Sequence, residues 1–308
     1  MGTVLELTLR APSEPAGRAL LERLYARAEA LEAELSTWRP GSSVSRLNAA
    51  AGAGPVEVAP ELAALLREAL ALSARTEGAF DVRVGPLVAL WKEAAQRGRL
   101  PTAAELDPAR ALAGGELTLL PGERASLGEP GMSLELGGIA KGFALDRLAE
   151  ELRAAGVADA LLSFGESSVV ALGAPEAGGR WRLLVRGPAG EMAGVLALRD
   201  RALSVSASLG QAEEIAGRRF GHVLDPRSGV PLEEARVAVV LAPTAGAAEA
   251  WSKAVLVLGA GRGLALAEAE PGVEALLLEG GGRSSATSGF AALSGFEAVG
   301  PGEGGPRR

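Results

Sequence analysis

The sequence predicts a mixed α/β (α+β) fold, with largely antiparallel sheets and packed helices. Short apolar strands follow one another between Ala160 and Ala242, and elsewhere helices and strands occur without the steady alternation of a parallel α/β sheet. Leucine and alanine also recur at helical spacing in several segments. At 308 residues, 48% of them hydrophobic, the chain is long enough to bury a sizeable core.

In the first half of the chain, two helices are predicted, over Glu14–Leu35 and Pro60–Arg75, because apolar residues repeat along one face of each. Thr102 and Glu105 form a capping-box pattern, so a short helix is expected to start there. The other predictions are a half-buried strand within Met1–Arg10, where Leu5, Leu7 and Leu9 alternate with polar residues, a polar loop over Ser36–Asn48, and strands over Leu117–Leu120 and Ser133–Leu136 around a turn at Pro121-Gly122.

In the second half, a helix is expected from Gly138 to Gly156, whose glycine suits the position just past a helix end. We expect one domain over residues 1–299, which could comprise two sub-lobes, followed by a loose tail over 300–308. The other predicted elements are strands over Ala160–Phe164, Val169–Leu172, Trp181–Arg186, Ala193–Leu198, Ala202–Ser206, Arg236–Ala242 and Val273–Leu278, and a helix over Ala245–Leu258.

Composition excludes several classes of function. The net charge is −7 and the chain has no basic block, so no nucleic-acid partner is expected. The absence of cysteine rules out disulfides, thiolate metal sites and cysteine nucleophiles. No apolar run reaches the length of a transmembrane helix. Because Met1–Arg10 lacks the layout of a signal peptide, we expect either a cytoplasmic protein or a trimmed exported form.

The single histidine, His222, lies in the segment Gly221–Gly229, which reads GHVLDPRSG. Pro226 and Gly229 predict a tight turn, with the carboxylate of Asp225 three residues from the imidazole. A lone histidine is most often an ordinary surface or core residue. The turn and the neighbouring carboxylate nevertheless favour a role in nucleophile activation, for which an imidazole is suited at neutral pH.

A glycine-rich strand-to-helix segment, LGGIAKGFALD, covers Leu136–Asp146. Glycines allow the backbone to approach a ligand, the free N–H groups of a helix start attract phosphate, and Lys141 adds a positive charge. A plain turn with a solvated lysine is an equally good interpretation of this segment by itself.

Two further segments carry aromatic residues beside polar ones. Glu77–Trp91 reads EGAFDVRVGPLVALW, and Ser36–Asn48 reads STWRPGSSVSRLN with Trp38 among polar residues. An aromatic ring on a polar loop suits stacking on a flat ligand ring, although tryptophan more often covers the edge of a core.

Taken in order, these segments resemble the FAD:protein FMN transferases, or ApbE-type flavin transferases. That family carries a serine-aromatic-arginine-proline loop ending in Ser-Arg-Leu-Asn, as Ser36–Asn48 does, and Gly-Ala-Phe-Asp leading to Gly-Pro-Leu-Val and Trp, as Gly78–Trp91 does. Its Gly-Ile-Ala-Lys-Gly-aromatic-Ala-x-Asp helix resembles Gly138–Asp146, and its His-x-x-Asp-Pro-x-Ser/Thr-Gly turn resembles His222–Gly229. Met1-Gly2-Thr3 looks like the Met-Gly-Thr that opens the family's domain.

The resemblance implies an ApbE-like, T-fold-related architecture and a specific reaction. Such enzymes bind FAD, split its pyrophosphate with Mg²⁺, and join FMN to a threonine or serine hydroxyl of a target flavoprotein, releasing AMP. Most members are periplasmic or membrane-anchored. By position, His222 and Asp225 would be catalytic, and the backbone carbonyl of Ala140 and the side chain of Glu249 would be metal ligands. The residues that would bind the flavin nucleotide are Trp38, Ala79, Phe80, Asp81, Gly137, Lys141 and Phe143.

The chain departs from the family pattern in three places. The family's metal-binding helix has Asp followed four residues later by Thr, where this chain has Glu249 and Lys253. Gly165-Glu166-Ser167 replaces Gly-Gly-Asp, and Ser206-Ala207-Ser208 replaces Thr-Ser-Gly. Glu249 and Lys253 share a helix face, so they could form a surface salt bridge or, if turned inward, place an ammonium group where a metal is expected.

Two alternatives to an active transferase remain at this point. One is a non-catalytic FAD-binding or structural member of the family with a degenerate metal site. The other is a dinucleotide-binding domain, because Ala254–Ala267 imitates the strand-glycine-helix fingerprint. The third glycine of that fingerprint falls on Leu264, however, and Ala250, Ala254 and Leu258 share a helix face, which argues against it.

Overall fold

The computed structural model describes residues 3–176 and 178–299. The chain divides into two compact units: a helical unit of residues 26–140 and 210–233, and a sheet unit of residues 3–25, 141–209 and 234–299. The single domain predicted over 1–299 stays a prediction, and the predicted loose tail over 300–308 lies outside the described residues. In the described part, no helix is long and apolar enough to cross a membrane.

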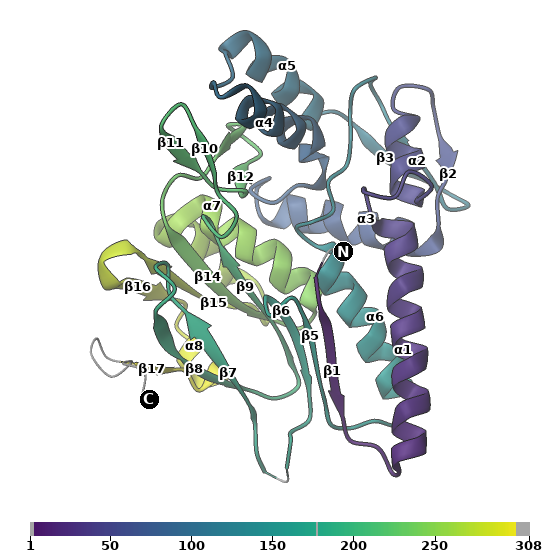
Figure 1. Cartoon of the computed structure of the whole chain (residues 1–308), viewed down its shortest axis with the longest axis vertical. Coiled ribbons are helices and arrows are strands. Elements are labelled where there is room, and N and C mark those ends of the chain that lie inside the picture. The colour runs from purple at the N-terminus through teal and green to yellow at the C-terminus, as the bar shows by residue number, and fades with distance from the viewer. Residues whose placement is uncertain (1–2, 177, 300–308) are drawn as a thin grey trace. The chain divides into compact units, whose positions relative to one another are not determined.

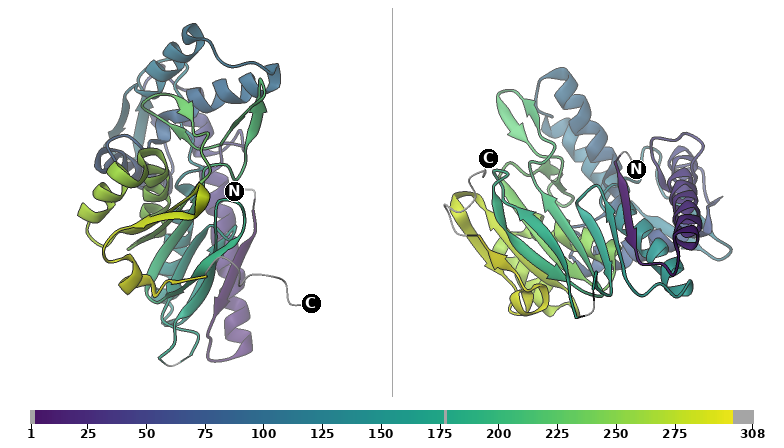
Figure 2. Two further views of the ribbon diagram at one scale, coloured as in Figure 1. Left: turned by 90° about the vertical axis from the view of Figure 1, so that its left-hand side faces the viewer. Right: turned by 60° about the horizontal axis from the view of Figure 1, so that its bottom comes forward.

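The sheet unit is built on a seven-stranded sheet in which every neighbouring pair is antiparallel (Figures 1 and 2). Figure 2 shows its strands side by side, from the purple β1 to the yellow β16. In spatial order the strands are β1 (Leu5–Leu9), β5 (Ala160–Phe164), β6 (Ser168–Leu172), β9 (Arg201–Ala207), β14 (Arg236–Ala242), β15 (Glu274–Glu279) and β16 (Arg283–Ala286).

The two faces of this sheet have different neighbours. Val237, Val239 and Leu241 of β14 join an apolar cluster that includes Val185 and Leu196 of a second sheet. Because side chains alternate along a strand, the intervening residues of β14 face the opposite side, where helix α7 (Ala245–Ala269) packs on β9, β14 and β15. The central strand is therefore covered on both faces and is apolar almost throughout.

The second sheet has three antiparallel strands in the order β17-β8-β7. The α8 helix contacts both β8 and β15, and Phe290 of that helix is buried in the shared apolar cluster. The bounds are β7 Trp181–Arg186, β8 Met192–Leu198, η2 Gly280–Gly282, α8 Phe290–Ser294 and β17 Glu297–Ala298.

Helix α7 begins against helix α6 (Ala140–Ala154) within the sheet unit. Thr244 is the N-cap of α7, and its hydroxyl oxygen accepts the Ala247 N–H. The Asp146 carboxylate of α6 accepts the N–H groups of Ala245 (2.8 Å) and Gly246 (2.9 Å). A side chain at Gly142 would collide with the Ala245 carbonyl, because its Cβ would lie 2.3 Å from that oxygen. Glycine at this position therefore lets the two helix starts touch.

The helix predicted over Ala245–Leu258 is confirmed, because the backbone leaves helical geometry at Gly259 (φ 72°); a second helical segment then continues α7 to Ala269. Gly259 has the backbone conformation that favours glycine, so one helical segment follows another with little interruption. The segment Ala254–Ala267 lies within α7 and contains no strand, which contradicts the dinucleotide-binding alternative.

The helical unit contains α2, α3, α4 and α5, a 3-10 turn and a three-stranded sheet in the order β2-β4-β3. Helix α1 starts in the sheet unit and ends in the helical unit. The bounds are α1 Glu14–Leu35, α2 Ser43–Ala49, β2 Val56–Glu57, α3 Pro60–Arg75, η1 Val82–Val84, α4 Gly85–Arg97, α5 Ala103–Ala113, β3 Leu117–Leu120 and β4 Arg124–Leu127.

Two local predictions in this unit are wrong. Ser36–Asn48 is not entirely loop, because Ser42 accepts the Ser45 N–H and caps α2. Ser133–Leu136 forms no strand, and β3 pairs instead with β4, across the predicted turn at Pro121-Gly122. The backbone N–H and C=O of Leu134 both form hydrogen bonds with the Asn48 side-chain amide, so this residue needs no neighbouring strand as a partner.

Residues 210–233 add two antiparallel hairpins to the helical unit: β10 (Glu213–Ile215) with β11 (Arg218–Phe220), and β12 (Leu224–Asp225) with β13 (Val230–Pro231). Trp91 of α4 contacts both hairpins. Its ring lies 5.0 Å from that of Phe220, and its Nε1–H donates to the Gly229 carbonyl at 2.8 Å. Two contacts thus flank the turn that carries His222.

Candidate functional site

Trp38 is the most exposed large apolar side chain in the helical unit, at 81%. The Lys92 ammonium of α4 lies 4.9 Å from the centroid of its ring, within the range of a cation–π contact. This exposure excludes the interpretation of Trp38 as a core-edge residue. The indole is a flat surface available for stacking.

The Asp81 carboxylate is nearly buried and accepts four hydrogen bonds. Oδ1 accepts the backbone N–H (2.8 Å) and Nε–H (2.9 Å) of Arg83, and Oδ2 accepts Nη2–H of Arg83 (2.6 Å) and the Ser73 hydroxyl (2.8 Å). Arg83 in turn donates to the Gly115 carbonyl. Hydrogen bonding to Asp81 raises the pKa of Arg83. Asp81 therefore orders the start of η1 and holds Arg83.

Three of the predicted flavin-binding residues have buried side chains. Ala79 and Phe80 are buried in the helical unit and Phe143 in the sheet unit. A Cβ added at Gly138 would lie 3.3 Å from the Phe80 ring, so the ring packs closely against the Gly138 backbone. Gly137 is exposed, and its N–H donates to Glu135 Oε1 at 2.9 Å.

His222 is exposed in the helical unit, and its Nδ1 accepts the backbone N–H of Gln211 at 3.4 Å. A backbone nitrogen can only donate, so a neutral imidazole in this arrangement carries its proton on Nε2. The geometry presents Nε2–H as a hydrogen-bond donor.

The Asp225 carboxylate is bound by Arg227. Oδ1 accepts the backbone N–H and Nε–H of Arg227, and Oδ2 accepts Nη2–H, each at 2.9 Å. This hydrogen bonding raises the pKa of Arg227. The pair repeats the aspartate-x-arginine arrangement of Asp81 and Arg83, and among the described residues it is Arg227 that engages the Asp225 side chain. Asp225 holds a half-exposed guanidinium beside the His222 turn.

The sheet unit contains a buried ion cluster at the starts of α6 and α7. The Glu249 side chain is fully buried, and its Oε1 lies 3.0 Å from the Lys141 ammonium and accepts the Ser168 hydroxyl. Lys253, one turn further along α7, is partly exposed and acts electrostatically on the same carboxylate. The inward placement of Glu249 contradicts the surface salt bridge considered from the sequence.

Serine hydroxyls from the sheet and from α7 form hydrogen bonds next to this cluster. Ser168 and Ser204 are paired across β6 and β9 and, with Ser206, project from the face that α7 covers. The Ser252 hydroxyl lies 3.1 Å from that of Ser204 and 2.8 Å from that of Ser206, and it also contacts the Glu249 carbonyl. This polar patch interrupts an otherwise apolar sheet face.

The charges in the cluster shift one another's titration. Burial acts to raise the pKa of Glu249, but the ammonium groups of Lys141 and Lys253 and the Ser168 hydrogen bond outweigh it, so the pKa is lowered. Burial, opposed by Glu249 and reinforced by Lys141, lowers the pKa of Lys253 to about 8. Glu249 is therefore ionised at neutral pH, and it faces two positive groups.

The donor set around Glu249 does not fit a divalent cation. Mg²⁺ prefers oxygen ligands, whereas the only carboxylate of the cluster is paired with the Lys141 ammonium and has Lys253 one helical turn away, and a protonated ammonium offers no lone pair. The Glu249 Oε2 atom is buried without a hydrogen bond of normal geometry, but one such oxygen is not a site. Throughout residues 3–176 and 178–299, no group of three acidic or histidine side chains could hold a metal.

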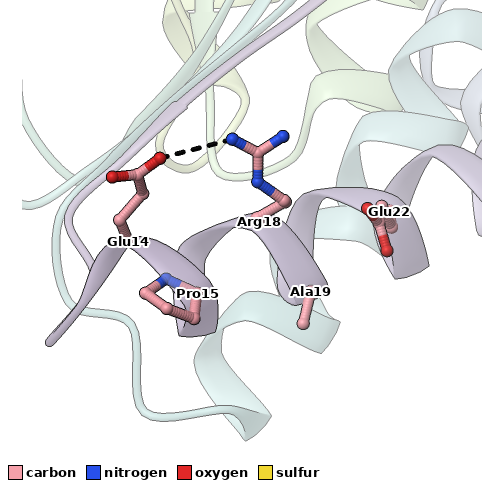
Figure 3. Close-up of a pocket in the computed structure, with 5 residues that line it drawn as sticks. All are labelled: Glu14, Pro15, Arg18, Ala19 and Glu22. Atoms are coloured by element: carbon pink, nitrogen blue, oxygen red, sulfur yellow. Dashed lines mark hydrogen bonds and ion pairs between the residues drawn. The ribbon is translucent and has the colours of Figure 1, made fainter.

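A shallow hollow along α1 contains none of the residues singled out by sequence (Figure 3). It is lined by Glu14, Pro15, Arg18, Ala19 and Glu22. Its polar contact is an exposed ion pair of Arg18 with Glu14 at 3.3 Å. An exposed pair of this kind contributes little to stability, and the hollow has no features of a functional site.

Sequence reasoning did not single out Lys92 or Arg227. The rarity of lysine could have drawn attention to Lys92, because only three of the 31 basic residues are lysines: Lys92, Lys141 and Lys253. The signal for Arg227 was the repeat of the Asp81-x-Arg83 spacing. The structure brings Lys141 and Glu249 together, and it places Asp225 on Arg227.

Comparison with known proteins identifies the family. A sequence model of the ApbE family matches residues 1–277. This chain belongs to the ApbE family. The FAD:protein FMN transferase of Salmonella typhimurium is 31% identical over 271 residues, covering 84% of this chain and 77% of that protein. That of Vibrio cholerae is 30% identical over 276 residues, covering 87% and 82%.

Solved ApbE structures confirm the predicted fold. The flavin transferase ApbE of Vibrio cholerae superposes with a TM-score of 0.81 at 26% identity, covering 95% of this chain and 96% of that one. The apo form of the Pseudomonas stutzeri flavinyl transferase ApbE gives a TM-score of 0.82 at 30% identity, covering 98% and 95%. The mixed α/β architecture with antiparallel sheets is therefore that of the ApbE family.

Proposed function

We propose that this ApbE family member binds FAD and transfers its FMN moiety to a threonine or serine hydroxyl of a target flavoprotein. The observation that carries the proposal is family membership, since the relatives from Salmonella typhimurium and Vibrio cholerae are named FAD:protein FMN transferase. The motif residues in both units are consistent with it.

The reaction is a phosphoryl transfer. The hydroxyl oxygen of the target attacks the phosphorus of the FMN half, a new P–O bond forms, and the bond from that phosphorus to the bridging oxygen of the pyrophosphate breaks. AMP leaves with the bridging oxygen, and the hydroxyl proton passes to solvent or a base. Such chemistry depends on positioning and on neutralising phosphate charge rather than on covalent help from the protein.

The proposed roles follow the placement of each side chain. Trp38 stacks on a flat ring of FAD, Gly137 allows close approach of the backbone, and Lys141 provides positive charge for a phosphate. The buried Ala79, Phe80 and Phe143 shape their surroundings. Asp81 and Asp225 act through the arginines that they hold, Arg83 and Arg227.

His222 is proposed to act at the transferred phosphoryl group. With Nδ1 accepting from Gln211, the neutral ring offers Nε2–H to a phosphate oxygen or a leaving oxygen. This geometry favours donation of a proton or hydrogen bond over removal of a proton by Nε2. Arg227, held by Asp225 in the same turn, would contribute a fixed positive charge to the same region of the helical unit.

Mg²⁺ is expected from the family, but the residues of this chain do not fit it. The Ala140 carbonyl belongs to the first residue of α6, where it is directed along the helix, and Glu249 is held by Lys141. We therefore route no step of the reaction through a metal.

Replacing Glu249 and Lys253 of α7 with the residues of the family pattern should create affinity for a divalent metal. In the Glu249→Asp, Lys253→Thr double variant, one ammonium is replaced by a hydroxyl oxygen, so we expect Mn²⁺ binding measured by electron paramagnetic resonance to appear. The unmodified protein and the Arg182→Thr variant, altered at an exposed residue of β7, should show none. Tight Mn²⁺ binding by the unmodified protein would contradict the donor-set argument.

Replacing the exposed indole should weaken FAD binding. Stacking on an aromatic side chain contributes about 1–3 kcal/mol per base, so Trp38→Ala is expected to raise the FAD dissociation constant roughly 5- to 150-fold. Quenching of flavin fluorescence measures the change. Trp38→Phe is the control and should retain most of the affinity, whereas equal affinities for all three proteins would remove Trp38 from the site.

One experiment tests the function as a whole. The purified protein is titrated with FAD and with NAD, and AMP release is followed in the presence of a threonine- or serine-containing acceptor flavoprotein. FAD binding with AMP release supports the transferase, and FAD binding without AMP release supports the non-catalytic alternative. NAD binding as tight as FAD binding would overturn both.

A further inference from the structure

The chain uses lysine at very few places, and two of these share one buried carboxylate. Lys141 and Lys253 both act on Glu249, although arginine supplies 28 of the 31 basic residues. Lysine carries a compact point charge with three donors, whereas arginine presents a broad planar fork. The choice of lysine at these two positions indicates a site that needs small, concentrated positive charge.

The cluster carries more positive than negative charge. Lys141 pairs with the Glu249 carboxylate, Lys253 lies one helical turn from it on α7, and the Ser168 hydroxyl that bonds the carboxylate is neutral. The charged groups that act on Lys253 are Glu249 and Lys141, so its ammonium shares a single counter-charge with a second cation. A purely structural ion pair needs one cation for Glu249, and Lys141 fills that role at 3.0 Å.

The excess charge is accessible. Glu249 is fully buried, but Lys141 is 20% exposed and Lys253 is partly exposed. Because the carboxylate is fully buried and both lysines are partly exposed, an anion in solvent meets the lysines before the carboxylate. Lys141 also lies at the start of α6, where helix N–H groups favour negative charge.

We propose that Lys253, one helical turn from Glu249 on α7, forms together with Lys141 a protein-borne cation site for phosphate oxyanions, which binds the pyrophosphate of FAD without a divalent metal. This inference rests on the proposed function for the identity of the ligand. The same site accepts free inorganic pyrophosphate, because the ammonium groups recognise the oxyanion and not the rings.

The test is a calorimetric titration of the full chain with FAD and, separately, with inorganic pyrophosphate, each in EDTA and in Mg²⁺. The variants are Lys253→Met, which keeps an unbranched side chain as far as Cε and removes the charged Nζ, and Lys253→Arg, which keeps the charge. Arg182→Met on β7 is the matched control for loss of a surface cation. Thermal unfolding of each variant verifies that it is folded.

We expect the unmodified protein to bind FAD and pyrophosphate in EDTA within twofold of their affinities in Mg²⁺. Lys253→Met should weaken both at least tenfold while its melting temperature is no lower, because the buried Glu249 keeps Lys141. Lys253→Arg should lose less than Lys253→Met, and Arg182→Met should bind as the unmodified protein does.

The outcomes separate this inference from the proposed function. Equal affinities for the unmodified protein and a folded Lys253→Met variant overturn the inference and leave FAD binding intact. Binding of FAD that requires Mg²⁺ overturns it as well. If FAD fails to bind in either buffer, the proposed function falls, and Lys253-dependent binding of pyrophosphate would still support the cation site.

Discussion

Replacing Glu249 with glutamine is expected to lower the free energy of unfolding by about 3–5 kcal/mol, the cost of removing one partner from a buried ion pair. The glutamine keeps the shape of the side chain and removes the counter-charge that Lys141 and Lys253 share. Ser168 also loses a charged acceptor. Urea unfolding followed by circular dichroism measures the change.

A second substitution should recover part of this loss. In Glu249→Gln with Lys253→Met, the remaining ammonium of Lys141 is 20% exposed and can reach water, so the double variant should be more stable than Glu249→Gln alone. Glu297→Gln is the surface control, since that side chain is 69% exposed, and it should change stability by less than about 0.5 kcal/mol. A Glu249→Gln variant as stable as the control would show that the cluster is not a coupled unit.

Replacing His222 with alanine is expected to lower the rate of AMP release about 10²- to 10⁴-fold, the range of acid–base catalysis by a positioned side chain. The FAD dissociation constant should change by less than twofold, since a group that acts at the transferred phosphoryl contributes in the transition state and little to ground-state binding. Single-turnover AMP release and a fluorescence titration of FAD separate the two effects.

Trp38→Ala provides the opposite pattern, with affinity lost and the rate at saturating FAD retained. His222→Gln is a further control, because its amide can donate a hydrogen bond but cannot transfer a proton. Partial activity in His222→Gln would indicate that donation to a phosphate oxygen is the main contribution of Nε2–H. Unchanged rates in His222→Ala would exclude His222 from the reaction.

Regular periodicity made much of the fold predictable. The bounds of α1 and α3, and of β5, β7 and β14, agree with the predictions because each element buries one continuous apolar stripe or, in β14, both faces. The missed elements lack such a stripe. The α2 helix has seven mostly polar residues and depends on its Ser42 cap, and the hairpins of residues 210–233 are short.

The order of the motifs predicted the family and the candidate site residues, but not which groups the side chains of those residues contact. Asp225 was expected to serve His222 because the two are close in sequence. In the structure the carboxylate instead meets the Arg227 guanidinium two residues away, since the turn lets the side chain bond the backbone and the fork together. Trp91, part of a recognised motif, proved to hold that turn in place.

By itself, the sequence determined the antiparallel α+β class, membership of the ApbE family and the shared helix face of Glu249 and Lys253, because these depend on local periodicity and on residue order. The tertiary structure decided which way that face points and what meets it there. Lys141, Ser168 and Glu249 come from three distant segments, and only the packing of α6 and α7 on the sheet brings their charges and hydroxyls within bonding distance. Burial of the Glu249 carboxylate then strengthens its attraction to Lys141, because water screens a buried charge less than an exposed one.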